Sequence, residues 1–334
     1  MLLFRQYLKR FEKRLAEKIS RRLLAEQREA SQRLLMLAGR QAAAKLCGKV
    51  HIQNLSDVEF RVFSQWGEDG IIEWLVAALP GISPSFVEFG VETYAEANTR
   101  FLLQSRNWRG LILDGDPRHA SAIRADPICW RHDLEFREAF ITAENINDLI
   151  SESGFAGDLG ILSIDVDGND YWILDRITCV RPAIIICEVN PVFGDRFAVT
   201  IPYRADFDRF QAHPSGLYFG ASIPALRMLA ERKGYRFIGT TSSGINAFFL
   251  RDDLAGPIEG RIGECRAWPS RHRDSRAEDG TLDFAAPLQR YERIKHLPVL
   301  DLATGKESPL AELGPAFSDD WLRQLAAGGV DRHA

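Results

Sequence analysis

The chain has 334 residues, of which 46% are hydrophobic and 26% charged, and its formal net charge is −4. These values predict a soluble globular protein with room for one large domain and an appendage. The longest apolar stretches, such as residues 183–189, fall well short of the roughly 20 residues that span a bilayer, so we expect no transmembrane helix. The five cysteines are scattered without CxxC spacing, which argues against a disulfide framework or a structural zinc site.

The first fifty residues differ in charge from the rest of the chain. They contain 13 Lys and Arg against 4 Asp and Glu, whereas the remaining residues carry 29 against 42. Apolar residues recur there at steps of three and four, which predicts an amphipathic helix; they are Phe4, Leu8, Phe11, Leu15, Ile19 and Leu23. Its apolar stripe is suited to packing on its own protein or a partner subunit, or to lying on an anionic membrane surface. Nucleic-acid binding is disfavoured because the rest of the chain is acidic.

The start of the chain also bears on its location. Charges interrupt every apolar pair at the N-terminus, so the apolar core of a secretion signal is missing and we expect a cytoplasmic protein. Residues 1–47 would allow peripheral association with the inner face of the membrane, or self-association, and we expect a homo-oligomer.

From Ser85 onward, short apolar strands alternate with helical stretches. The predicted strands are 85–91, 110–116, 128–134, 159–167, 183–190, 235–241 and 246–252. Helical segments of about ten residues lie between the first five strands, including 98–106, 117–125 and 143–153. This alternation indicates βαβ units and a mostly parallel sheet.

The last two predicted strands are joined by only a short Ser-Ser-Gly-rich turn, which favours an antiparallel hairpin. An antiparallel final strand in a mostly parallel seven-stranded sheet is typical of the class I methyltransferase fold, a Rossmann-like α/β fold. We therefore divide the chain into a basic helical extension (1–50), a methyltransferase domain (51–255) and a C-terminal extension (256–334). The last of these is predicted to be loop-rich with one short final helix.

Polar residues follow each of the first five predicted strands, where open α/β sheets bind their ligands. In strand order they are Glu88 and Gly90, Asp114 and Asp116, Asp133, Asp165 and Asp167, and Glu188 and Asn190. This pattern predicts an adenosyl ligand. Gly90 permits a close backbone approach, and an acid after the second strand can accept both ribose hydroxyls, with Asp114 the first choice and Asp116 the second. Asp133 is placed to accept from the adenine amino group, and Glu88 and Asp165 lie near the methionine ammonium.

The loop after the first strand has few glycines. Gly90 stands alone, and Glu92 occupies a position where a second glycine often falls. A loop that cradles phosphate would have more glycine and no acid. The sequence therefore favours a ligand without phosphate over a dinucleotide.

Five motifs in this order resemble the FkbM-type S-adenosylmethionine-dependent methyltransferases, whose characterised members O-methylate sugars and natural-product hydroxyls. The motifs are SQWGEDGIIEWL (64–75), FVEFGVETYAEANTRFLL (86–103), NWRGLILDGDP (107–117), GDLGILSIDVDGNDYWIL (157–174) and PAIIICEVNPVFG (182–194). The resemblance covers roughly residues 60–250 and implies S-adenosylmethionine as cofactor. It adds Asn98 to the cofactor-binding residues and implies that the segment from Ser64 to Asp69 covers the cofactor, the alternative for Ser64 being a capping box.

Two interpretations of the acids after the fourth strand stay open. In metal-dependent O-methyltransferases of this fold, acids and an asparagine after strands four and five hold Mg²⁺, and Asp167 with Glu188 and Asn190, or Asp165 in place of Asp167, would supply these ligands. Alternatively, Asp165 contacts the cofactor while Asp167 and Asp170 cap the following helix.

If no metal acidifies the acceptor hydroxyl, a general base is needed, and His213 is the candidate because histidine titrates near neutrality. Asp165 and Asp167 complete the predicted catalytic set.

The activity predicted is O-methyl transfer to a hydroxyl of a small molecule or glycan, such as a surface polysaccharide, glycolipid or secondary metabolite. One rival is a metal-dependent nucleotide-sugar glycosyltransferase, because ILSIDVD also resembles an apolar strand ending in Asp-x-Asp. Another is a non-catalytic scaffold with a methyltransferase fold.

Overall fold

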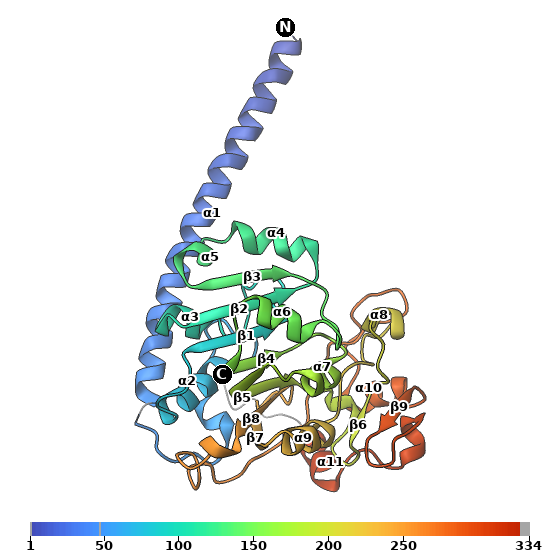
Figure 1. The fold of residues 1–334 in the computed structure, drawn as a ribbon. Helices are drawn as coiled ribbons and strands as arrows, with labels where there is room; N and C mark the ends of the chain where they lie inside the picture. The colour runs from blue at the N-terminus through green and yellow to red at the C-terminus, as the bar shows by residue number, and fades with distance from the viewer. Residues whose placement is uncertain (1, 47, 328–334) are drawn as a thin grey trace.

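The computed structural model describes residues 2–46 and 48–327, and it contains the predicted seven-stranded sheet. The strands lie in the order β3-β2-β1-β4-β5-β8-β7 (Figure 1). Their bounds are β1 Ser85–Phe89, β2 Arg109–Asp114, β3 Leu134–Glu138, β4 Gly157–Ile164, β5 Val180–Glu188, β7 Tyr235–Thr240 and β8 Asn246–Arg251. The first five strands are parallel, whereas β8 is antiparallel to both β5 and β7. This arrangement is the class I methyltransferase fold, so the predicted fold class and closing hairpin are confirmed.

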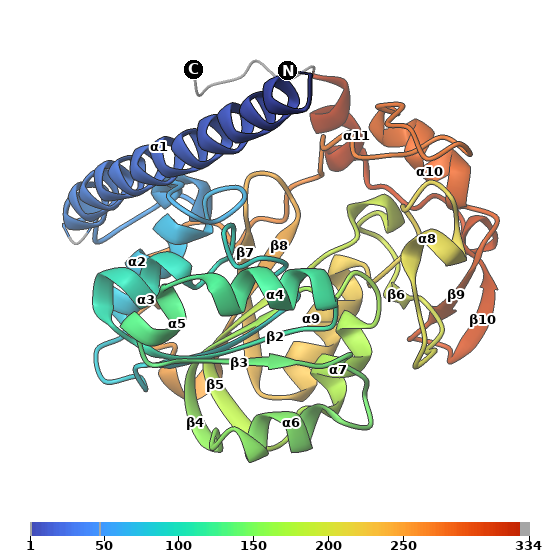
Figure 2. The same cartoon turned by 90° about the horizontal axis from the view of Figure 1, so that it is seen from above.

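Helices cover both faces of the sheet (Figure 2). One layer consists of α2 Glu68–Ala78, α3 Arg100–Arg106, α4 Pro117–Ala125 and α5 Ile128–Arg131; the other consists of α6 Ile146–Glu152, α7 Asp170–Arg176 and α9 Ile223–Arg232. Side chains alternate across each strand, so Phe86 packs under the first layer and Val87 and Phe89 under the second. All three are at most 1% exposed, and burying each contributes about 1.5–3 kcal/mol to folding. The two apolar cores hold the sheet rigidly and fix where its strands end.

The third strand lies later in the chain than its predicted range of 128–134. Residues 128–131 instead form α5, because Pro127 suits a helix start and the Asp126 side chain accepts from the Ile128 N–H at 2.9 Å. Strand β3 begins only at Leu134. Asp133 therefore precedes β3 rather than following it.

Helix α1 spans Leu2–Leu46 and extends well past the predicted apolar stripe. Its C-terminal part packs against α2 and α3, where a Cβ atom on Gly39 would lie 2.5 Å from Val62 Cγ2, so the close approach requires glycine. Its N-terminal part projects from the body of the protein (Figure 1), and Ile19 and Leu23 are exposed. The side chains of Phe4, Leu8, Phe11 and Leu15 lie outside the described residues. Within the described residues, no helix combines the length and apolar character needed to cross a membrane.

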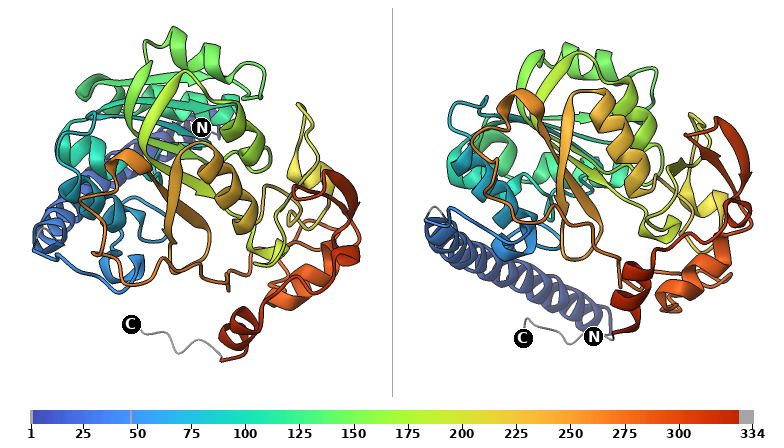
Figure 3. Two further views of the ribbon diagram at one scale, coloured as in Figure 1. Left: turned by 60° about the horizontal axis from the view of Figure 1, so that its bottom comes forward. Right: turned by 90° about the horizontal axis from the view of Figure 1, so that it is seen from below.

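Two segments distant in sequence form one structure beside the carboxyl ends of the strands; we call residues 190–222 and 270–327 together the cap (Figure 3). It contains the strands β6 Val199–Thr200, β9 Pro298–Asp301 and β10 Lys306–Pro309, which form a small antiparallel sheet, and the helices α8 Arg209–Ala212, α10 Pro287–Ile294 and α11 Asp319–Ala326. Short 3₁₀ helices occur in the cap and elsewhere, at η1 Leu55–Val58, η2 Pro191–Phe193, η3 Asp252–Leu254 and η4 Leu310–Leu313. An apolar cluster that includes Val199, Tyr218 and Val299 joins the two segments. The C-terminal extension is thus more ordered than predicted: only the final helix was expected, and α10, β9 and β10 were missed.

Candidate active site

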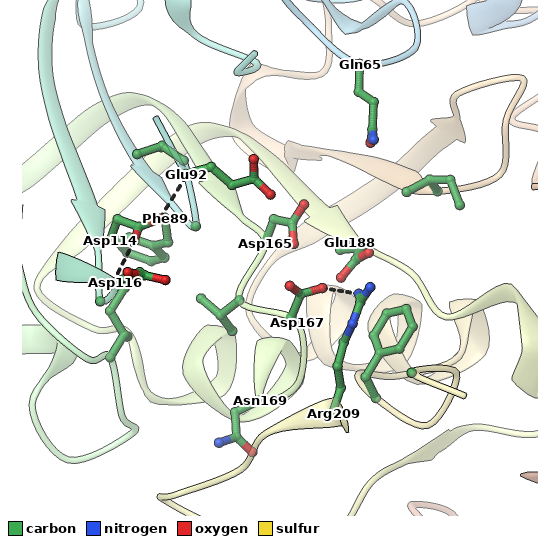
Figure 4. A pocket seen from close by; sticks show the side chains of 18 of the residues that line it. Gln65, Phe89, Glu92, Asp114, Asp116, Asp165, Asp167, Asn169, Glu188 and Arg209 are labelled. Carbon is green, nitrogen blue, oxygen red and sulfur yellow. Dashed lines mark hydrogen bonds and ion pairs between the residues drawn. The ribbon is translucent and has the colours of Figure 1, made fainter. Parts of the chain in front are cut away.

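A cavity of about 1000 Å³ lies at the carboxyl ends of the strands and is walled on the other side by the cap (Figure 4). The sheet contributes the residues that end β1, β2, β4 and β5, and the cap contributes side chains from both of its segments. Most predicted site residues line it, namely Glu88, Gly90, Asn98, Asp114, Asp116, Asp165, Asp167, Glu188 and Asn190. Parallel strands deliver these groups to one edge because their carboxyl ends coincide.

The loop after β1 is held in an unusual backbone conformation. Gly90 has φ +67°, and a Cβ atom there would lie 1.6 Å from the Asp165 carbonyl oxygen, so only glycine fits. Glu92 and Tyr94 have φ of 47° and 58°, which is costly for residues with a side chain. The strain is offset by hydrogen bonds, since Asp114 Oδ2 accepts from the Glu92 N–H at 2.8 Å.

Glu88 acts on the other end of the same loop. Its carboxylate accepts from the Asn98 N–H at 2.8 Å and from the Thr99 N–H at 3.1 Å, and also from the Thr99 hydroxyl. Burial raises the pKa of Glu88 to about 7 despite these bonds. Glu88 therefore shapes the loop, and Asn98 presents its side-chain amide to Ser163 Oγ at 3.1 Å.

Asp114 and Asp116 stand together at the end of β2. Besides Glu92, Asp114 accepts from the Asp116 N–H at 2.8 Å, and its Oδ1 lies 3.0 Å from His119 Nδ1. Asp116 caps α4 and pairs with Arg118, whose hydrogen bond lowers the Asp116 pKa to about 2. Both residues line the cavity, but only Asp114 keeps a lone pair for a ligand's hydroxyl group, on Oδ2, because Arg118 donates to both oxygens of Asp116.

Three carboxylates meet between β4 and β5. Asp165, Asp167 and Glu188 each offer an oxygen within 4.8 Å of the others. Glu188 is 8% exposed, and its Oε2 has no hydrogen-bond partner among the described residues. Burial, and then repulsion by the neighbouring carboxylates, raises the pKa of Asp165 and Glu188 well above the ordinary values. Arg209 of the cap donates to Asp167, as Figure 4 shows.

Asp170 stands apart from these three acids. Its two oxygens accept from the Val166 N–H at 2.9 Å and the Gly168 N–H at 3.1 Å, so it ties the loop after β4 to the first turn of α7. The helix-capping interpretation thus fits Asp170. Asp167 does not share it, because its carboxylate points to Arg209.

Three sequence-based roles need correction. Asp133 precedes β3 and does not line the cavity, so it is not placed to meet an adenine there. His213 lies beyond the single turn of α8, with Nδ1 2.7 Å from Ser215 Oγ and its ring against His296, and it too is absent from the cavity wall. The amide of Asn190 donates to the carbonyls of Leu217 and Phe219 at 2.9 and 2.8 Å, and its Oδ1 accepts from the Val192 N–H, so it fixes the cap rather than completing a metal site.

The segment before α2 reaches over the cavity, where Gln65 and Trp66 line it. Two acids hold the segment: Asp69 Oδ2 accepts the N–H groups of 62–64, and Glu68 Oε2 accepts those of 66 and 67. In return the Ser64 hydroxyl accepts from the Asp69 N–H at 3.1 Å.

Sequence reasoning missed the residues that the cap contributes: Arg209, His272, Asp274 and Arg290 line the cavity. Arg209 lies 3.8 Å from Asp274, and His272 packs edge-on against Trp66 with ring centroids 5.0 Å apart. Three of the four come from the C-terminal extension. Its high arginine content was the only available signal, and composition alone does not show which surface such a loop covers.

The cavity is strongly acidic. Among the described residues its wall carries ten carboxylates (Glu88, Glu92, Glu96, Asp114, Asp116, Asp165, Asp167, Glu188, Asp208 and Asp274) and three guanidinium groups (Arg118, Arg209 and Arg290). A cavity lined mostly by one sign of charge concentrates ligands of the opposite sign. Eight of the ten carboxylates come from the sheet side, whereas the cap contributes Arg209 and Arg290 beside Asp208 and Asp274. The sheet side is therefore the part suited to a ligand that carries positive charge.

No family model and no curated protein matches the sequence. Solved structures similar to this chain include the O-methyltransferase from Bacillus cereus in complex with SAH (18% identity, 53% of this chain and 76% of that chain, TM-score 0.34). A putative O-methyltransferase from Klebsiella pneumoniae is also similar (15% identity, 65% of this chain and 88% of that chain, TM-score 0.34). So is human N-acetylserotonin methyltransferase in complex with SAM (15% identity, 55% of this chain and 54% of that chain, TM-score 0.29). The chain thus spans about half the length of the human protein. At these levels of similarity, the fold assignment rests on the strand order itself.

Proposed function

We propose that the protein is an S-adenosylmethionine-dependent O-methyltransferase of the FkbM type that methylates a hydroxyl of a sugar or another polyhydroxylated molecule. The observation that carries the proposal is the acidic cavity at the carboxyl edge of a class I methyltransferase sheet. S-adenosylmethionine has a sulfonium and an ammonium group, and both are favoured there. A dinucleotide or nucleoside diphosphate would bring phosphates to the same wall and would find no glycine-rich loop to hold them.

The residues at β1 and β2 are assigned to the cofactor. Asp114, which is rigidly held by three contacts, accepts from the ribose hydroxyls, and the loop from Gly90 to Asn98 approaches the methionine part. Gln65 and Trp66 cover the part of the cavity that is assigned to the cofactor. Rigid placement of the sulfonium supports transfer, because aligning the acceptor oxygen, methyl carbon and sulfur supplies most of the rate enhancement.

The acids at β4 and β5 are assigned to the acceptor hydroxyl. In the transfer step the hydroxyl oxygen forms a bond to the methyl carbon, the carbon–sulfur bond breaks to leave the thioether of S-adenosylhomocysteine, and the hydroxyl proton moves to a carboxylate. Glu188 suits this role, since its residue lines the cavity and burial moves its pKa upward, as in other catalytic carboxyls. Asp165 positions it, and the Arg209–Asp167 pair orients the acceptor.

A divalent cation is the second candidate for this cluster. Asp165, Asp167 and Glu188 offer three hard oxygen ligands, which fit Mg²⁺, and such an ion would bind and acidify the acceptor hydroxyl. Two observations weigh against it: Arg209 already pairs with Asp167, and Asn190 uses its amide elsewhere. We therefore favour the proton-transfer arrangement.

Binding experiments separate this function from its rivals. We expect S-adenosylhomocysteine to raise the melting temperature and to bind in calorimetry. A response only to a nucleoside diphosphate with Mn²⁺ would support a glycosyltransferase instead. No response to either would support a scaffold, although a scaffold gives no reason to keep an unpartnered buried carboxylate oxygen.

A further inference from the structure

Arg290, on helix α10 of the cap, is a buried guanidinium with few partners. The residue is 4% exposed, and the one hydrogen bond that the described residues offer it runs from an Nη to the Ser270 carbonyl at 3.2 Å. Its Nε has no partner among them. None of their ion pairs includes Arg290, although Asp274 is near enough to attract it.

Two other arginines show that the combination of deep burial and few partners is specific to Arg290. Arg293, one turn further along α10, is partly exposed and pairs with Asp283 at 2.5 Å. Arg209, which also lines the cavity, has an unpartnered Nε as well, but it donates to Asp167 and lies 3.8 Å from Asp274. Arg290 is more deeply buried than either and has less compensation.

A charge in this position is costly unless an opposite charge reaches it. Burial lowers the pKa of Arg290 to about 10, and the attraction of Asp274 does not offset the burial. Because the side chain forms part of the cavity wall, the missing partner has a path to it from the cavity. A guanidinium with free donors is matched by the two oxygens of a carboxylate or phosphoryl group.

The position of Arg290 also indicates which ligand would carry the anion. The acids assigned to the cofactor come from β1 and β2 of the sheet, whereas Arg290 comes from the cap, together with His272 and Asp274. The carboxylate of S-adenosylmethionine would be expected on the sheet side, near the loop after β1. With the sheet side assigned to the cofactor, the cap side around Arg290 is left for the acceptor, and the contact of His272 with Trp66 marks where the two sides meet.

We propose that Arg290 binds an oxyanion group of the methyl acceptor, so that the acceptor is an acidic polyhydroxylated molecule with a carboxylate or phosphoryl substituent. This inference rests on the proposed function. The carboxylate of a uronic acid and the phosphoryl group of a sugar phosphate share the required chemistry, and the experiment below distinguishes them.

In the test, the protein is first saturated with S-adenosylhomocysteine. It is then titrated, at matched ionic strength, with one of three probes: D-glucuronate, inorganic phosphate or methyl glucoside. We expect D-glucuronate or phosphate to bind and methyl glucoside to bind more weakly. Glucuronate binding alone assigns a carboxylate, and phosphate binding alone assigns a phosphoryl group. Arg290→Gln should lower the affinity for the bound anion roughly 10- to 100-fold, the range expected for a lost charge-assisted hydrogen bond.

Two further variants make the result decisive. Arg293→Gln removes an arginine from the same helix and should leave anion affinity unchanged. Arg290→Lys keeps the charge but loses the planar fork, so it should bind the anion with intermediate affinity, and it serves as the test if Arg290→Gln does not fold. Equal anion affinity in the wild type and the Arg290 variants, or no anion binding by the wild type, overturns the inference. Failure of wild-type protein to bind S-adenosylhomocysteine refutes the proposed function instead.

Discussion

Replacing Glu188 by glutamine should make the stability of the protein less sensitive to pH. Glu188 is buried beside Asp165 and Asp167, and burial raises its pKa well above the ordinary value. The folded state therefore holds a proton at pH values where the unfolded chain has already lost it. Since the unfolded state then binds fewer protons, the free energy of unfolding falls as pH rises above the ordinary pKa of about 4.3, until the folded pKa is passed.

The size of the effect follows from proton linkage. One group whose protonation differs between the two states changes the free energy of unfolding by at most about 1.4 kcal/mol per pH unit. Glutamine cannot ionise, so Glu188→Gln removes this contribution. It also removes the carboxyl whose hydrogen bond lowers the pKa of Asp165, which burial and the charges of Asp167 and Asp170 raise. Above the ordinary pKa the variant should be more stable than the wild type, and its advantage should grow with pH.

Urea unfolding, followed by circular dichroism from about pH 5 to about pH 8, measures these slopes. Glu231→Gln, on the exposed surface of α9, is the matched control and should follow the wild-type curve. Methyl transfer should fall in Glu188→Gln even though stability rises. Equal slopes in wild type and Glu188→Gln would refute the interpretation of Glu188 as a buried, destabilising acid.

Four other perturbations test the site. Asp114→Ala should weaken S-adenosylhomocysteine binding by about 1–3 kcal/mol in calorimetry, because ribose hydroxyls lose an acceptor, and unchanged binding would refute that assignment. Gly90→Ala should destabilise the protein by about 1–3 kcal/mol in urea unfolding, since its Cβ would meet the Asp165 carbonyl. Gly81→Ala, with φ +94° and open space around it, should cost less, and equal losses would contradict the packing argument. Activity should survive EDTA, and restoration of lost activity by Mg²⁺ would instead assign a metal to Asp165, Asp167 and Glu188. His213→Ala should keep near-wild-type turnover, and a large loss of turnover with folding intact would restore His213 as the base.

Many of the residues at the carboxyl edge of the sheet could be predicted, because the patterns that mark them lie within short stretches of the sequence. The apolar runs of β1, β2, β4 and β5 each end in acids, and the periodicity of the intervening segments indicates crossover helices. Parallel topology then brings Asp114, Asp165 and Glu188 to one cavity without further information. Asp133 was misplaced because residues 128–134 read equally well as a strand, whereas Asp126 and Pro127 start a helix there.

The cap could not be predicted because its contacts are long-range. Strand β6 has two residues and pairs with β9, about a hundred positions later, so neither has a periodic pattern of its own. The roles of Arg209 and Arg290 depend on that pairing. Asn190 and His213 were also misjudged because their contacts are not visible in the sequence. Asparagine suits metal binding, but the amide of Asn190 donates to two backbone carbonyls. Histidine suits proton transfer, but the ring of His213 is hydrogen-bonded to Ser215.

The most direct test of the account is calorimetric titration of the wild-type protein with S-adenosylhomocysteine, without added metal. The account predicts one site per chain with a dissociation constant in the micromolar range, and a clear loss of affinity in Asp114→Ala. Absence of binding at millimolar S-adenosylhomocysteine, together with binding of a nucleoside diphosphate and Mn²⁺ by the same protein, would contradict it.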